Sequence, residues 1–156
     1  MPLHALQTMV EEDPGNPELI RAMINPALRL GQQPAIDEAM SHAGPGLIDR
    51  DPGLVAYYLA DLRGSPGIYQ PVHLLHLASL MERSGEPERA IHLYRLVSES
   101  QPTAPESEAA LYRRALCYWN VFKDAAAARS CLCEMEQRFP NGEMLPFGRD
   151  LRRKIG

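Results

Sequence analysis

The stretch from Gly85 to Pro102, GEPERAIHLYRLVSESQP, sets a glycine, the small Ala90, the ring of Tyr94 and a closing proline within one amphipathic pattern. Pro87 suits a first helical turn, because the N–H that proline lacks has no acceptor within the helix there. The apolar residues that follow recur at helical spacing. The stretch therefore predicts a helix over 87 to 100 that buries one face and stops before the final proline.

Composition places the whole chain among folded proteins. Its 156 residues are 45% hydrophobic and 23% charged, which is too apolar for a disordered chain and sufficient for one compact domain. The start, MPLHALQTMVEEDP, lacks the continuous apolar run of a leader, and no stretch approaches the roughly 18 apolar residues of a membrane span. We expect no direct membrane insertion.

The charge and cysteine content narrow the function class and the compartment. Residues 1 to 67 carry nine acidic and four basic side chains, which argues against a nucleic-acid interface there. The three cysteines are an odd number and do not describe a disulfide framework. We expect a cytoplasmic protein that has no nucleic-acid partner.

Helix-forming residues dominate the chain, and β-branched residues nowhere alternate with polar ones over a useful length. Clusters of glycine and proline divide it, which predicts an all-α fold of about nine helices. They are expected near 3 to 11, 17 to 30, 34 to 43, 52 to 63, 70 to 84, 87 to 100, 105 to 121, 124 to 138 and 143 to 155. Pro26 would kink or split the second of these, and Asp124 is a good N-cap.

A pattern of large and small residues recurs along the second half. Its first copy consists of Leu74, Leu77, Ala78, Met81, Ala90, Tyr94 and Pro102, and its second of Leu111, Ala115, Tyr118, Ala128, Leu132 and Pro140. The alanines allow helix backbones to approach closely, and the large residues fill the space between helices. The second copy has one extra residue between its helices, so we expect an altered turn near Phe122 and Lys123.

This pattern resembles the tetratricopeptide repeat (TPR), which reads W-x-x-L-G-x-x-Y, then A-x-x-x-F, then P. The resemblance implies an antiparallel helix-pair array, a TPR-like α-solenoid with a right-handed superhelix, as a single domain over 1–156. Its expected parts are degenerate repeats over 1–46, an irregular connector with one helix over 47–69, the best repeat over 70–102, a second repeat over 103–141 and a C-terminal capping helix over 142–156.

The resemblance also implies a function, that of a non-catalytic protein-interaction scaffold whose concave groove binds a peptide or a partner helix. Counting family positions from the markers gives the groove candidates Leu75, His76, Ser79, Glu82, Arg83, Tyr112, Arg113, Leu116 and Trp119. Aromatic anchors would hold the partner, and Arg83 and Arg113 would orient it. Trp119 has a second interpretation, in which it packs under the C-terminal capping helix.

The expected N-terminal helix suggests a second class of function. Residues 3 to 11 look like the second helix of a repeat whose first helix is missing, so Leu3, Leu6, Met9 and Val10 need a cover. The following helices, a second copy or upstream sequence could supply it. The chain would then be a structural, regulatory or self-associating segment of a larger protein, including one anchored in a membrane, and a homodimer is one expected arrangement.

No catalytic or phosphate-binding motif occurs, and acidic pairs stand at expected helix starts, where the helix dipole favours them. Cys131 and Cys133 lie about 200° apart around a helix and cannot converge on one metal ion. His73, His76 and His92 lack such partners and are expected at helix surfaces. We therefore expect no enzyme, no cofactor and no metal.

The expected capping helix has Leu145, Phe147, Leu151 and Ile155 for an inner face. Its basic run, Arg149 to Lys154, falls at the end of the helix, where the dipole favours cations. Attraction to phosphate or to an anionic bilayer is the other interpretation of these charges.

The repeat predicts that Ala90 sits where two helix backbones come closest. Replacing it by leucine is expected to overpack that contact and to lower the free energy of unfolding by about 1 to 3 kcal/mol. Urea denaturation of Ala90→Leu measures this, and an unchanged midpoint would contradict the placement of Ala90.

Overall fold

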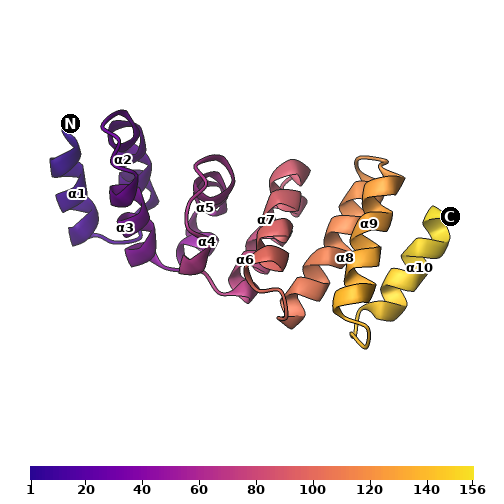
Figure 1. Cartoon of the computed structure of the whole chain (residues 1–156). Helices are drawn as coiled ribbons and strands as arrows, with labels where there is room; N and C mark the ends of the chain where they lie inside the picture. The colour runs from indigo at the N-terminus through magenta and orange to yellow at the C-terminus, as the bar shows by residue number, and fades with distance from the viewer. The chain divides into compact units, whose positions relative to one another are not determined.

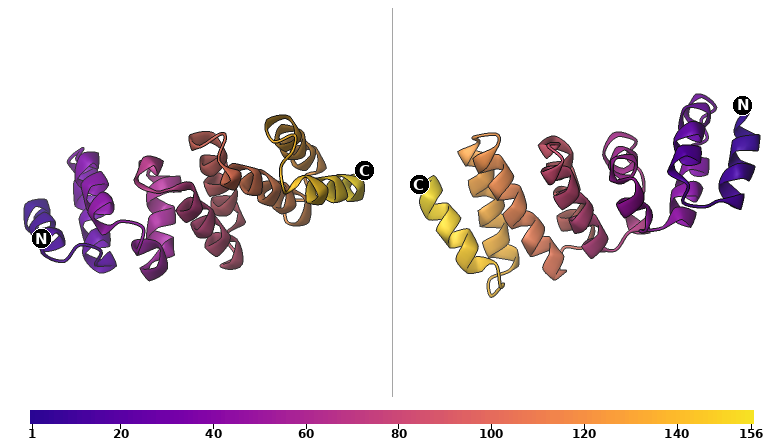
Figure 2. Two further views of the ribbon diagram at one scale, coloured as in Figure 1. Left: turned by 90° about the horizontal axis from the view of Figure 1, so that it is seen from below. Right: turned by 180° about the vertical axis from the view of Figure 1, so that it is seen from behind.

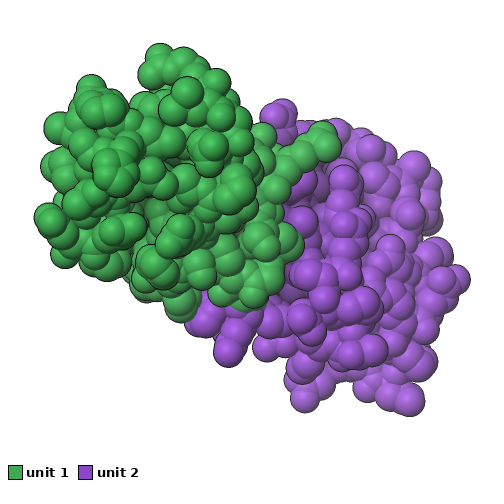
Figure 3. All heavy atoms as spheres, turned by 60° about the vertical axis from the view of Figure 1, so that its left-hand side comes forward, with its two compact units in different colours: residues 1–69 green, residues 70–156 purple.

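The computed structural model describes residues 1–156 and contains ten α-helices and no β-strand, which confirms the all-α prediction. None of these helices has both the length and the apolar character needed to cross a membrane. The chain divides into two compact units, residues 1–69 and residues 70–156 (Figure 3). The second unit begins where the best repeat was expected to begin.

Unit 1 is built from short helices and irregular turns (Figure 1). Its elements are α1 (Leu3–Glu12), α2 (Pro17–Arg29), α3 (Gln33–Ala43), α4 (Leu47–Arg50), α5 (Pro52–Ala56), a π-helical turn (Tyr57–Asp61) and a 3-10 turn (Pro66–Ile68). Helix α2 runs through Pro26 without being split, and the side chain of Asn16 caps its start by accepting a hydrogen bond from the Glu18 N–H at 3.1 Å.

The apolar face of α1 is covered inside the chain. Leu3, Leu6 and Val10 are buried, and α1 packs against both α2 and α3. Met9 is the only exposed residue among the four apolar residues of this face, with 37% of its surface exposed. The helices that follow α1 therefore supply its cover, and the bare surface from which we expected a dimer is not there.

The connector over 47–69 contains one more helix than expected. The additional helix is α4, a single turn, while the segment expected as a helix near 52 to 63 is α5 followed by the π-helical turn. The phenol of Tyr58, in that turn, donates a hydrogen bond to Asp37 at 2.7 Å and accepts one from the Ser65 N–H at 3.0 Å. Burial, together with Asp37, raises the pKa of Tyr58, so the phenol stays a donor. This bond ties the connector to α3.

Unit 2 consists of five helices that run antiparallel in succession (Figures 1 and 2). They are α6 (Pro71–Arg83), α7 (Pro87–Ser100), α8 (Pro105–Asn120), α9 (Ala125–Arg138) and α10 (Leu145–Ile155). Each packs on the next, and α6 also contacts α8, while α8 contacts α10. The helices α6, α8 and α10 therefore neighbour one another along one side of the unit.

The marker residues of both repeats form the interior of unit 2. The apolar markers Leu74, Leu77, Ala78, Met81, Ala90, Tyr94, Leu111, Ala115, Ala128 and Leu132 are all buried, and Tyr118 is half-buried. Gly85 turns the chain between α6 and α7 with φ +79°, a conformation that glycine adopts without strain. The turn after α8 instead places Lys123 at φ 55°, so the expected altered turn is confirmed, and Asp124 caps α9.

The capping helix α10 differs from expectation in its inner face. Leu145 and Leu151 are buried as expected, but Phe147 is 55% exposed and was wrongly placed inside. Gly148 takes the inward position and lies against the side chain of Met135. Gly148 is three residues from both Leu145 and Leu151 and lies between them on the inner face, whereas Phe147 lies at the edge of that face beside the Tyr112 ring.

The close contact between Gly64 and the Tyr58 ring predicts an asymmetry between two neighbouring glycines. A Cβ at Gly64 would overlap the ring, whereas a Cβ at Gly67 would meet nothing within 4 Å. We expect Gly64→Ala to lower the free energy of unfolding by about 1 to 3 kcal/mol and Gly67→Ala to leave it nearly unchanged. Equal urea midpoints for the two variants would show that the ring is free to move.

Candidate functional site

The main hollow of unit 2 lies between α6 and α8 and has a volume of about 410 Å³. We call it the α6–α8 groove. It is lined by Val72, Leu75, His76 and Ser79 of α6, Tyr94 of α7, Ala109, Tyr112 and Arg113 of α8, and Met144 just before α10. Its walls come from two rigid helices, and its lining combines apolar side chains with one guanidinium.

The groove brings together five of the nine predicted site residues, namely Leu75, His76, Ser79, Tyr112 and Arg113. They meet because each group follows helical spacing on its own helix and because α6 lies against α8. The Tyr112 ring is half-buried and lies 6.2 Å from the Phe147 ring of α10, centroid to centroid. Arg113 is exposed at the edge of the groove.

The other four predicted residues lie elsewhere. Glu82 is half-buried and accepts a hydrogen bond from the Tyr94 hydroxyl at 2.8 Å, and Arg83 reaches back to the Ser79 carbonyl oxygen at 3.4 Å. Leu116 and Trp119 pack against a core cluster that includes Leu151 of α10. Trp119 is thus half-buried against this cluster and does not line the groove.

Sequence reasoning missed four groove residues. Val72 and Ala109 stand one helical turn before the predicted groups of α6 and α8, so extending the same spacing would have found them. Tyr94 was assigned to the core, and its ring is indeed fully buried while also forming the floor of the groove. Met144 precedes α10 outside any helical pattern, and no sequence signal points to it.

A buried polar cluster lies beneath the groove. Burial raises the pKa of Tyr94, and its hydrogen bond to Glu82 adds to the effect. Burial, reinforced by the Glu82 carboxylate, also raises the pKa of the Cys117 thiol to about 12, while Arg113 acts in the opposite direction. Both groups are therefore neutral donors at physiological pH, and Glu82 is their shared acceptor.

The histidines and cysteines singled out in the sequence have other surroundings. No group of three or more His, Cys, Asp or Glu side chains is placed to hold a metal ion. His73 belongs to the capping box of α6 and accepts a hydrogen bond from the Gln70 N–H at 3.4 Å. The Cys133 sulfur accepts one from Arg152 at 3.1 Å, while Cys131 is buried beside Arg114.

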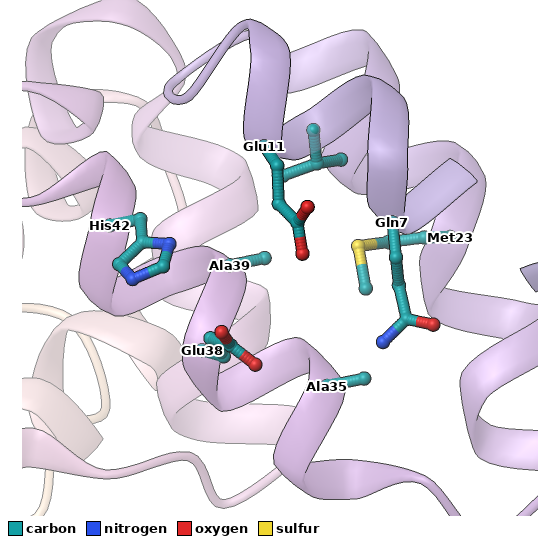
Figure 4. Close-up of a pocket in the computed structure, with 8 residues that line it drawn as sticks. Gln7, Glu11, Met23, Ala35, Glu38, Ala39 and His42 are labelled. Atoms are coloured by element: carbon teal, nitrogen blue, oxygen red, sulfur yellow. The ribbon is translucent and has the colours of Figure 1, made fainter. Parts of the chain in front are cut away.

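Unit 1 has a much smaller cavity of about 20 Å³ between α1, α2 and α3, which is room for about one water molecule. Figure 4 shows Gln7 and Glu11 of α1 facing Glu38 and His42 of α3 across it.

A second hollow of unit 2, about 260 Å³, is lined by Ile91, Tyr118 and Phe122 with two acidic residues. The α6–α8 groove is larger than this second hollow and carries most of the predicted site residues.

Comparison of this chain with protein-family models, with curated proteins and with solved structures finds no match. The resemblance to the tetratricopeptide repeat thus depends on the residue pattern alone.

The raised pKa of Cys117 predicts a pH dependence. The unfolded chain loses the thiol proton from about pH 9.0, whereas the folded chain keeps it until about pH 12. The unfolded state then binds fewer protons, so this contribution to stability is complete below pH 9.0 and is lost as the pH rises toward 12. The difference in free energy of unfolding between the wild type and Cys117→Ala should shrink over that range in urea titrations. A constant difference would contradict the burial of the thiol.

Proposed function

We propose that this chain is a TPR-like protein-interaction module and that its α6–α8 groove binds a peptide or a helix of a partner protein. The observation that carries this proposal is the groove itself. Val72 is 50% exposed and Leu75 half-exposed there, although the marker residue Leu74, which lies between them in the sequence, is buried. Apolar side chains left open between two helices are typical of a surface that receives another chain.

The lining of the groove suits a peptide better than a small polar molecule. Tyr112, Leu75 and Met144 offer a broad apolar surface, and the guanidinium of Arg113 offers a fork of donors at the edge. Aromatic and arginine side chains contribute disproportionately to binding at protein interfaces. We expect the ligand to place apolar anchors in the groove and a carbonyl or carboxylate oxygen near Arg113.

The groove chemistry favours binding over catalysis. Cys117 is the nearest thiol beneath it, and burial keeps this sulfur protonated, whereas a nucleophile needs the thiolate. The hydroxyl of Tyr94 donates its hydrogen bond to the Glu82 carboxylate. All three cysteines are free thiols, which supports a reducing compartment such as the cytoplasm.

A displayed library of random peptides, selected on the full-length protein, tests the groove. The informative variant is Val72→Glu combined with Arg113→Ala, because both side chains are exposed and their replacement leaves the core intact. We expect selected peptides to bind this variant at least about tenfold more weakly than the wild type in fluorescence anisotropy, with an unchanged melting temperature.

The matched control is Val121→Glu combined with Arg149→Ala. Val121 is 53% exposed, close to the value of Val72, and directly precedes Phe122, which lines the second hollow. Arg149 belongs to the basic run of α10. The control is expected to bind like the wild type. Loss of binding by the control, with the groove variant still active, would assign the site to one of those two regions and overturn the proposal.

A further inference from the structure

Glu108, in the first turn of α8, has an unusual environment for a charged side chain. It is only 5% exposed, and its Oε2 atom has no hydrogen-bond partner. A buried carboxylate oxygen without a partner costs free energy, because it gives up its hydration and receives nothing in return. The dipole of α8 favours negative charge at this end, but it would favour the less buried Glu106 equally well.

The fold makes room for this carboxylate. Gly142, in the turn between α9 and α10, lies directly against it, and a Cβ at that position would overlap Oε2. The Glu108 side chain lines a recess of about 370 Å³ next to this turn. The Glu108 side chain thus forms part of the wall of a hollow that is large enough for another side chain, while its Oε2 atom is covered by Gly142.

The recess adjoins the α6–α8 groove, since Ala109 and Met144 line both. Glu143 adds a second acidic group to the recess, and no lysine, arginine or histidine lines it. Phe139 and Met144 supply an apolar wall of the kind against which the alkyl stem of a long cationic side chain packs. The charge and shape of the recess therefore complement a lysine or an arginine.

We propose that the recess at Glu108 binds a lysine or arginine side chain of the peptide that occupies the α6–α8 groove. This inference rests on the proposed function and narrows the partner to a segment with a basic residue next to its apolar anchors. The incoming cation would pair with the Glu108 carboxylate, which the fold leaves with an unsatisfied oxygen. Such a charge-assisted hydrogen bond, formed away from water, is stronger than one between neutral groups.

The test uses the peptides selected from the displayed library on the full-length wild type. We expect them to carry lysine or arginine at a fixed distance from the apolar positions. Glu108→Gln keeps the shape and removes the charge, and it is expected to weaken binding by at least about tenfold. Glu106→Gln, on the same turn of α8, is the matched control and should bind like the wild type. Gly142→Ala retains the charge but displaces the carboxylate, so it should also weaken binding.

Two further readouts separate a binding role from a structural one. Replacing the basic residue of the peptide by alanine should weaken binding to the wild type but have no further effect on Glu108→Gln. The melting temperature of Glu108→Gln should be unchanged or higher, because a buried unpaired charge is removed.

The outcomes distinguish this inference from the function on which it rests. If the binding of the selected peptides depends on Val72 and Arg113 but the peptides show no preference for lysine or arginine, the inference about Glu108 is overturned. The proposed binding function of the groove then still stands. A lowered melting temperature of Glu108→Gln, or full binding by Gly142→Ala, would also overturn it. If no selected peptide depends on Val72 and Arg113, the proposed function itself fails, and the inference fails with it.

Discussion

The arrangement of unit 2 depends on the close approach of consecutive helices at alanine positions. Ala78, Ala90, Ala115 and Ala128 are all fully buried, so a longer side chain at any of them would have to displace its neighbours. Because α7 packs against both α6 and α8, the Tyr94 ring is buried between them and becomes a floor. The apolar side chains of α6 and α8 above that floor have no further helix to cover them. The groove follows directly from packing helices in pairs.

Two carboxylates near this groove show how the same group can serve stability or binding. Glu82 finds its partners within the chain, since it accepts a hydrogen bond from the Tyr94 hydroxyl and lies beside the protonated thiol of Cys117. Glu108 is more deeply buried, and its Oε2 atom has no partner. A buried polar group that the fold leaves unsatisfied requires an explanation. The contrast between these two residues is the basis of our proposal that Glu108 meets a basic side chain of the ligand.

The sequence predicted the helices and their pairing well because they depend on local rules. Prolines at helix starts, the glycine at position 85 and the spacing of alanines all act through backbone geometry that neighbouring residues determine. The site was predicted only in part. Leu75, Tyr112 and Arg113 follow helical spacing, whereas Met144 and the recess at Glu108 arise where the α9–α10 turn meets α8, and tertiary packing alone brings those segments together. Phe147 was wrongly placed inside because Gly148, three residues from both Leu145 and Leu151, occupies the centre of the inner face of α10.

The most direct measurement of the binding face is an amide chemical-shift map of the full-length protein, recorded with and without a peptide selected from the displayed library. Our account predicts that the largest shifts fall on α6, on α8 and at Gly142 and Met144, with little change around Ile91 and Phe122. Shifts concentrated at the hollow of Ile91, Tyr118 and Phe122, or along the basic residues of α10, would contradict it.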